Sequence, residues 1–170
     1  MTTHTFETDD LLEQYVQGSV LLREAIAGLS ETALDTALHD HSWTIRQIVH
    51  HVVDGDELWK TCIKAALGSN EPFSMNWYWE ISQDSWAEMW RYARREVEPS
   101  LRLLQANRES IRQVLCLIPD ALEREVIVKW PEAGEQKGTI RDVIKMQVSH
   151  IAGHIAEINE IRETHGFKLA

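Results

Sequence analysis

Residues 139–166, TIRDVIKMQVSHIAGHIAEINEIRETHG, decide how this chain folds. Apolar side chains recur in this segment every three or four residues, which is the spacing of one face of an α-helix. These side chains are Ile140, Val143, Ile144, Ile151, Ile155, Ile158 and Ile161. Thr139 is suited to cap the start of such a helix, and Gly166 is suited to end it. The segment therefore predicts a long amphipathic helix with one apolar face to bury.

Three other segments have the same helical periodicity. The first spans residues 7–28, and the second spans 43–67 with Ser42 as its N-cap. The third spans residues 82–118 and contains Pro99, where we expect a kink or a restart because proline removes a backbone donor and clashes with the preceding turn. Four long amphipathic helices predict a helical bundle.

The rest of the chain consists of connections. Residues 125–130, EVIVKW, alternate weakly and are rich in β-branched side chains, so they predict a short strand or hairpin. We find no repeat and no flexible linker, and 170 residues fit one domain. We therefore expect a single all-α domain over residues 1–170.

Composition narrows the class of function. The formal net charge is −10, which repels phosphate backbones and argues against nucleic-acid binding. The sequence lacks a run of 18 apolar residues, and its first residues do not resemble a signal peptide, so we expect no membrane partner and a cytoplasmic location. Cys62 and Cys116 lie in apolar helical contexts and are predicted to be buried free thiols, with a disulfide between them as the alternative.

His150 and His154 are the first candidates for chemistry. They lie four residues apart on the predicted last helix, so both imidazoles stand on one face and can bind one metal ion. The same spacing also suits two structural histidines that bond to water or backbone. Ile151 occupies the position of the general-base glutamate in an HExxH metalloprotease, which argues against that chemistry.

A third ligand would come from the helix over residues 43–67. His51 lies about 100° from the centre of its apolar stripe, whereas His50 lies further toward solvent, so His51 is the better candidate. Asp54 is placed to orient His51 or to be a solvated charge. Glu157 shares the face of His150 and His154, as a fourth ligand, a proton acceptor or a surface residue.

Two stretches carry a family resemblance. Residues 39–59, HDHSWTIRQIVHHVVDGDELW, and residues 146–166, MQVSHIAGHIAEINEIRETHG, resemble the signatures of the DinB/YfiT-like superfamily of metal-binding four-helix bundles. The aromatic stretch NWYWEISQDSWAEM between them is similar to the family's loop before its third helix. The resemblance covers the whole chain in order and spacing.

The resemblance implies an up-down-down-up bundle and a homodimer. It places the family's metal ligands on His51, His150 and His154, with zinc or nickel as the expected ion. Some relatives have a further histidine five residues after the first ligand, and that position is Asp56 here, so a contact from it would be a carboxylate. Asp56 and Glu157 are the weak catalytic candidates, each as a general base.

The family's known activities include metal-dependent transfer of low-molecular-weight thiols such as bacillithiol or mycothiol. We therefore expect first a thiol S-transferase, whose metal activates a small thiol for attack on an electrophilic substrate. Arg46 and Arg141 are candidates to meet an anionic cosubstrate, or are solvated helix ends. Four tryptophans are candidates to line the mouth of the site, or simply to pack: Trp43, Trp77, Trp79 and Trp86.

Two alternatives stay open. The first is a metal-dependent hydrolase of a small amide or ester, which needs a positioned general base. The second is a non-catalytic, stress-related protein whose metal only ties two helices together. Fold alone does not choose among them.

Overall fold

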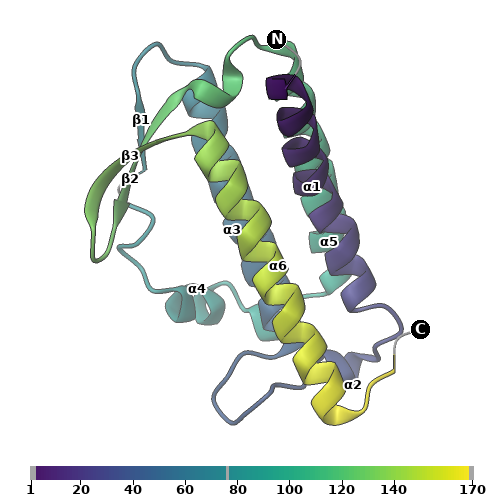
Figure 1. Ribbon diagram of the computed structural model, residues 1–170. Coiled ribbons are helices and arrows are strands. Elements are labelled where there is room, and N and C mark those ends of the chain that lie inside the picture. The colour runs from purple at the N-terminus through teal and green to yellow at the C-terminus, as the bar shows by residue number, and fades with distance from the viewer. Residues whose placement is uncertain (1–2, 76, 169–170) are drawn as a thin grey trace.

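Four long helices form an up-down-down-up bundle in the computed structural model, which describes residues 3–75 and 77–168 (Figure 1). The helices are α1 (Thr3–Ala25), α3 (Ile45–Leu67), α5 (Val97–Leu117) and α6 (Ile140–His165). Helices α1 and α6 run in one direction, and α3 and α5 run in the other. The all-α fold and the predicted helix order are confirmed.

Each long helix packs against two others. Helix α1 contacts α5 and α6, and α3 contacts the same two helices, so α1 and α3 lie at opposite corners. Apolar faces meet in the middle as two clusters of buried side chains, one toward each end of the bundle. This arrangement places the histidines of α6 beside those of α3.

The crossover between α3 and α5 differs most from the structure predicted from the sequence. These two helices are parallel, so the chain must return along the bundle, and it does so through β1 (Phe73–Met75), α4 (Gln83–Met89) and the 3₁₀ turn η1 (Tyr92–Arg94). A single helix over 82–118 with its break at Pro99 was therefore wrong. The break lies between α4 and α5, and Pro99 sits in the first turn of α5, where no intrahelical donor is lost.

A small sheet links α5 to α6. The predicted strand is present as β2 (Glu125–Trp130), pairing in parallel with β1 and antiparallel with β3 (Gly134–Thr139). Val126 and Val128 bury their side chains against the bundle. Strand β3 reads GEQKGT and is mostly exposed, so it has no apolar alternation by which the sequence would reveal it.

Helix ends follow local hydrogen bonding. Thr139 and Asp142 form a capping box at the start of α6, and Gly166 ends the helix in a left-handed conformation, as predicted. Helix α3 is capped by Thr44 with Gln47, not by Ser42, whose hydroxyl instead bonds within the preceding loop. A short helix, α2 (Glu31–Leu34), precedes that loop.

Both cysteines are free, so the predicted absence of a disulfide holds. Cys62 is buried, but Cys116 is exposed, because it lies on the solvent side of α5, and that half of the prediction was wrong. Within the described ranges, none of the helices combines the length and apolarity that a membrane crossing requires.

Candidate metal centre

Three imidazoles meet where α3 and α6 pack together. The Nε2 atom of His150 lies 3.0 Å from Nε2 of His51 and 3.2 Å from Nε2 of His154. All three ligand atoms lie within 4.8 Å of one another, and among the described residues this is the group found with metal-binding geometry. The structure thus brings together the three histidines that the sequence nominated.

Neighbouring side chains hold two of these rings in place. Trp43, just before α3, packs edge-on against His51 with 4.7 Å between ring centroids, and its Nε1 donates to Asp84 of α4. Nδ1 of His154 lies 3.0 Å from a carboxylate oxygen of Glu157 one turn on. A proton on that Nδ1 donates to the carboxylate and leaves Nε2 with a free lone pair, the usual support for a metal ligand.

The electrostatics of the site favour neutral rings. Burial, together with the neighbouring His150 and His154, lowers the pKa of His51 to about 3. Burial also lowers the pKa of His150 to about 4, aided by His154 and by Arg108. Neutral imidazole is the form that binds a metal, so the site is ready for one at neutral pH.

A divalent cation fits this donor set. The contact with Glu157 leaves Nε2 of His154 as a lone pair. His150 Nε2 lies close to Nε2 of both His51 and His154, but a proton on it can form a hydrogen bond with only one of them. A cation between the three lone pairs satisfies all of them. Three imidazoles also leave coordination positions open, which is typical of catalytic rather than structural sites.

The weak catalytic candidates lie in different places. Glu157 contacts His154, as described, and Asp56 lies deeper, where its carboxylate is 2.9 Å from Nε of Arg108 and both side chains are buried. Burial raises the pKa of the Asp56 carboxyl, against the opposing effect of the Arg108 guanidinium. Gly18 makes room for this pair, since a Cβ there would lie 2.6 Å from Nη1 of Arg108.

The neighbours of His51 on α3 differ from expectation. His50 is fully buried rather than directed toward solvent, with Nδ1 3.0 Å from Ser100 Oγ and Nε2 3.2 Å from the Arg95 carbonyl. Helix α5 and the turn before it cover this side of α3, which a single helix's periodicity does not reveal. Asp54 pairs with Arg95 at 2.5 Å and does not orient His51.

The two arginines considered for an anionic cosubstrate are held by acidic partners. Arg46 is buried and pairs with Asp35 at 2.6 Å and Glu31 at 2.7 Å, which joins α2 to α3. Arg141 pairs with Glu123 at 2.7 Å. Both therefore join segments of the fold rather than face the histidines.

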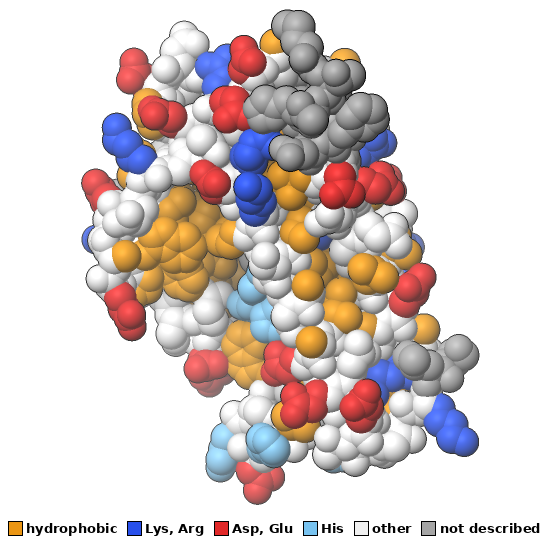
Figure 2. Space-filling model, viewed as in Figure 1, with side chains coloured by type: hydrophobic (Ala, Val, Ile, Leu, Met, Phe, Trp, Pro, Cys, Tyr) orange, Lys and Arg blue, Asp and Glu red, His pale blue; other side chains and the backbone are white. Residues whose placement is uncertain are grey.

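A cavity of about 300 Å³ opens beside the histidines, with His51 and His150 in its wall. Figure 2 shows histidine side chains at the surface between two apolar patches. Of the four tryptophans considered, Trp79 lines the cavity and Trp43 packs on His51, whereas Trp86 is buried and Trp77 is partly exposed.

The sequence reading missed three aromatic residues of this wall: Trp59, Tyr78 and Trp130. Trp59 lies on the apolar stripe of α3, a pattern that predicts a core residue. Trp130 ends the strand β2, and its position at the edge of an apolar run was the available signal.

Comparisons with known proteins agree with this description. YfiT from Bacillus subtilis, described as having an unusual four-helix bundle topology, superposes with a TM-score of 0.83 at 22% identity, over 99% of this chain and 91% of that one. At that identity the likeness shows the fold.

Sequence relatives extend the comparison. A protein of Bacillus cereus strain 03BB102 is 31% identical over 84% of this chain and 78% of its own length. One from Geobacillus thermodenitrificans is 27% identical over 86% of this chain and 79% of its own length. Both carry the name "Putative metal-dependent hydrolase". The family model for the DinB superfamily matches residues 14–158, and the chain belongs to that superfamily.

Proposed function

We propose that this protein is a metal-dependent thiol S-transferase whose ion, zinc or nickel, is held by His51, His150 and His154. The observation that carries the proposal is the convergence of three imidazoles, two of which, His51 and His150, line a cavity large enough for a small molecule. An ion bound there would lower the pKa of a coordinated thiol and so favour its nucleophilic thiolate form.

The chain's own residues position the reaction. Glu157 sets the tautomer of His154, and Trp43 fixes the ring of His51. The aromatic wall shields the nucleophile from water and orients the electrophile. The thiol sulfur forms a bond to the electrophilic carbon, the leaving group departs with its bonding electrons, and the thiol proton passes to solvent.

Thiol transfer is preferred to hydrolysis because of where the carboxylates lie. Hydrolysis of an amide or ester needs a general base near the attacking water. Glu157 is engaged with His154, Asp56 is engaged with Arg108, and none of the described residues that line the cavity carries a carboxylate. A thiolate needs no such base at the moment of attack.

Hydrolysis is the second candidate, because relatives over most of this chain carry a metal-dependent hydrolase name. The two activities separate in one assay. Purified protein is given chloroacetamide with cysteine, bacillithiol or mycothiol, and thioether product is measured by mass spectrometry. The same preparation without thiol is given 4-nitrophenyl acetate, and release of nitrophenolate is followed.

We expect thioether formation that depends on a bound divalent ion, measured by elemental mass spectrometry as about one ion per chain. His51→Ala and His154→Ala should lose both the ion and the activity. Thiol-independent ester cleavage that disappears in these variants would instead establish the hydrolase. A bound ion whose removal costs only stability would indicate the non-catalytic alternative.

The expected homodimer and the cytoplasmic location stay predictions. Light scattering on the purified chain measures the mass of the assembly against the 19.6 kDa of one chain. A mass near twice that value would establish the dimer.

A further inference from the structure

The cavity beside the histidines has an aromatic wall assembled from distant parts of the chain. Trp59 comes from α3, Tyr78 and Trp79 from the crossover, Trp130 from the hairpin and Met146 from α6. The Trp59 and Trp130 rings are inclined by 28° with centroids 6.4 Å apart, and the Trp79 ring lies 5.6 Å from that of Trp130. Such a surface favours a flat partner that can stack on it.

The wall carries no formal charge in the described part of the chain. Besides the aromatic residues and Met146, it contains His51, His150, Gln83 and Gln147, and none of the lining residues is Asp, Glu, Lys or Arg. Away from the ion that the histidines would hold, a charged ligand entering here would lose its hydration without gaining an opposite charge from the wall. The cavity therefore favours a neutral molecule.

Three side chains of the wall have unused hydrogen-bonding atoms. Gln147 is 98% buried, one turn before His150 on α6, and its Oε1 has no hydrogen-bond partner among the described residues. Buried Nε1 of Trp79 and buried Nε2 of Gln83 likewise have no described partner. Buried polar atoms are almost always paired, so two donors and one acceptor in one wall point to a ligand with complementary groups.

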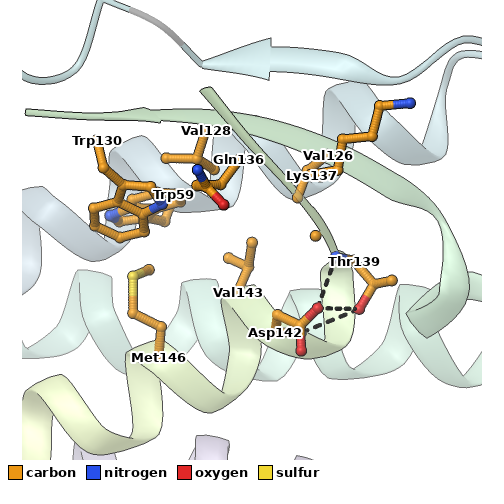
Figure 3. Close-up of a pocket in the computed structure, with 11 residues that line it drawn as sticks. Trp59, Val126, Val128, Trp130, Gln136, Lys137, Thr139, Asp142, Val143 and Met146 are labelled. Atoms are coloured by element: carbon orange, nitrogen blue, oxygen red, sulfur yellow. Dashed lines mark hydrogen bonds between the residues drawn. The ribbon is translucent and has the colours of Figure 1, made fainter. Parts of the chain in front are cut away.

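A second cavity of about 180 Å³ adjoins the first and shares Trp59, Trp130 and Met146 with it. Figure 3 shows this cavity between the hairpin and the start of α6, with Val143 in its floor. Asp142 is held in the capping box by Thr139, and Lys137 extends away from the cavity. This second space is apolar and extends the stacking surface away from the histidines.

We propose that the electrophile accepted by this protein is a neutral, flat, mainly apolar molecule that carries an amide-type pair of hydrogen-bonding groups. Its ring stacks on Trp59, Trp79 and Trp130. Its carbonyl accepts from Trp79 or Gln83, and its N–H donates to Oε1 of Gln147. This inference rests on the proposed function for the reaction that follows, but the binding site itself does not need it.

Binding of a non-reactive probe tests the site without turnover. 4-Nitroacetanilide is flat, neutral and bears an amide, and its nitro group quenches tryptophan fluorescence. We expect saturable quenching in the wild type, as purified and after chelation. Trp130→Ala should weaken binding about tenfold and Gln147→Leu about five- to tenfold.

Trp90→Ala is the matched control, because Trp90 is partly exposed, stacks on Trp86 and lines neither cavity. It should bind the probe as the wild type does. 4-Acetamidobenzoate tests charge and should bind at least tenfold more weakly after chelation, when no ion attracts its carboxylate. Equal binding of the two probes, or equal weakening by Trp90→Ala and Trp130→Ala, would overturn the proposal.

The stability of Gln147→Leu gives a second readout. Leucine is similar in size and removes an unpartnered buried acceptor, so its melting temperature should rise by about 2 to 4 °C while probe binding falls. A fall in melting temperature would show that Gln147 has a partner within the protein, and the proposal would fail.

Turnover separates this inference from the proposed function. 2-Chloro-N-(4-nitrophenyl)acetamide carries the proposed groups, and chloroacetamide is the same electrophile without the ring. We expect the aryl compound to be preferred in kcat/KM at least tenfold, and Trp130→Ala to lose that preference while still converting chloroacetamide. If both compounds are converted equally well, the inference about the electrophile fails and the proposed function stands. If neither compound is converted, the proposed function fails, and probe binding still tests the proposed binding site.

Discussion

Helix α3 has two polar faces that use the same kinds of residue in opposite ways. On the α5 side, His50, Asp54 and Asp56 meet groups of complementary character: Ser100 and a carbonyl for the histidine, and arginines for the carboxylates. On the α6 side, His51 meets two more imidazoles. His50 and His51 are adjacent in sequence, and both are buried.

The difference shows how to distinguish a structural polar cluster from a binding site. The α5 side pairs each of these carboxylates with a guanidinium less than 3 Å away, so its charges are balanced within the chain. The α6 side gathers three like groups whose lone pairs converge, a donor set that a cation from outside can use. Burial and shifted pKa values occur on both sides, so they do not distinguish a structural cluster from a binding site.

Loss of His51 should remove the metal ion, whereas loss of its neighbour His50 should not. His51→Ala should reduce bound metal from about one ion per chain to less than a tenth of that, because two remaining imidazoles on one helix hold a divalent ion weakly. His50→Asn, one residue away, should keep the ion and lose some stability. Elemental mass spectrometry on both variants measures this, and loss of metal from His50→Asn would place the site on the wrong face of α3.

Arg108→Met should have the next largest effect, on stability. It leaves the Asp56 carboxylate buried without its partner, and the free energy of unfolding should fall by about 3–5 kcal/mol. Urea denaturation at pH 7 measures the loss. Metal content of the folded fraction should not change, and a stable variant that had lost its metal would contradict the separation of the two sides.

Glu157→Ala should weaken the metal site without removing one of its ligands. The His154 ring keeps its coordinating atom but loses the acceptor for its Nδ1 proton, so metal affinity should fall about 10- to 100-fold. Competition with a chromophoric chelator measures the affinity. Glu160→Ala, an exposed position on the same helix, is the control and should bind metal normally.

Acid should have the smallest effect per residue, and its sign follows from the lowered pKa values. The pKa of His50 is lowered to about 4 by burial, and that of His51 to about 3, whereas unfolded histidine titrates near 6.5. Below pH 6.5 the unfolded state therefore binds more protons, and stability falls as the pH is lowered.

Between pH 6.5 and 5.5 each of these two histidines should contribute a loss of about 1 kcal/mol in the metal-free protein. Denaturation curves at the two pH values for wild type, His50→Asn and His51→Ala test this. Each variant should lose less stability on acidification than the wild type, and an unchanged pH dependence would show that the ring concerned is already accessible to protons.

Much of the fold could be predicted from the sequence because the signals of a helix lie in residues that are close together in the chain. The periodicity of α6, its Thr139 cap and its Gly166 end depend on residues within a few positions of each other. The break between α4 and α5 could not be placed in the same way. It follows from the need to return along the bundle between two parallel helices, which no local pattern records.

Some features of the candidate site could likewise be predicted from single helices, and others could not. His150 and His154 share a face by helix geometry alone, and the preference for His51 over His50 came from its angle to the apolar stripe. That angle did not reveal that His50 would be covered by α5 and bonded to Ser100. Nor did it reveal Trp130, which reaches the cavity because the hairpin lies beside α3 and α6.

By itself, then, the sequence determined an amphipathic four-helix chain, the three metal-binding candidates and the superfamily. Spacing along one helix and short motifs carry that information, because backbone geometry converts them directly into faces. The packing of the helices determines which buried histidine contacts other histidines, which carboxylates pair with arginine, and which aromatic side chains line the cavity. Those outcomes depend on contacts between residues separated by up to about a hundred positions, and such contacts form only when the helices pack.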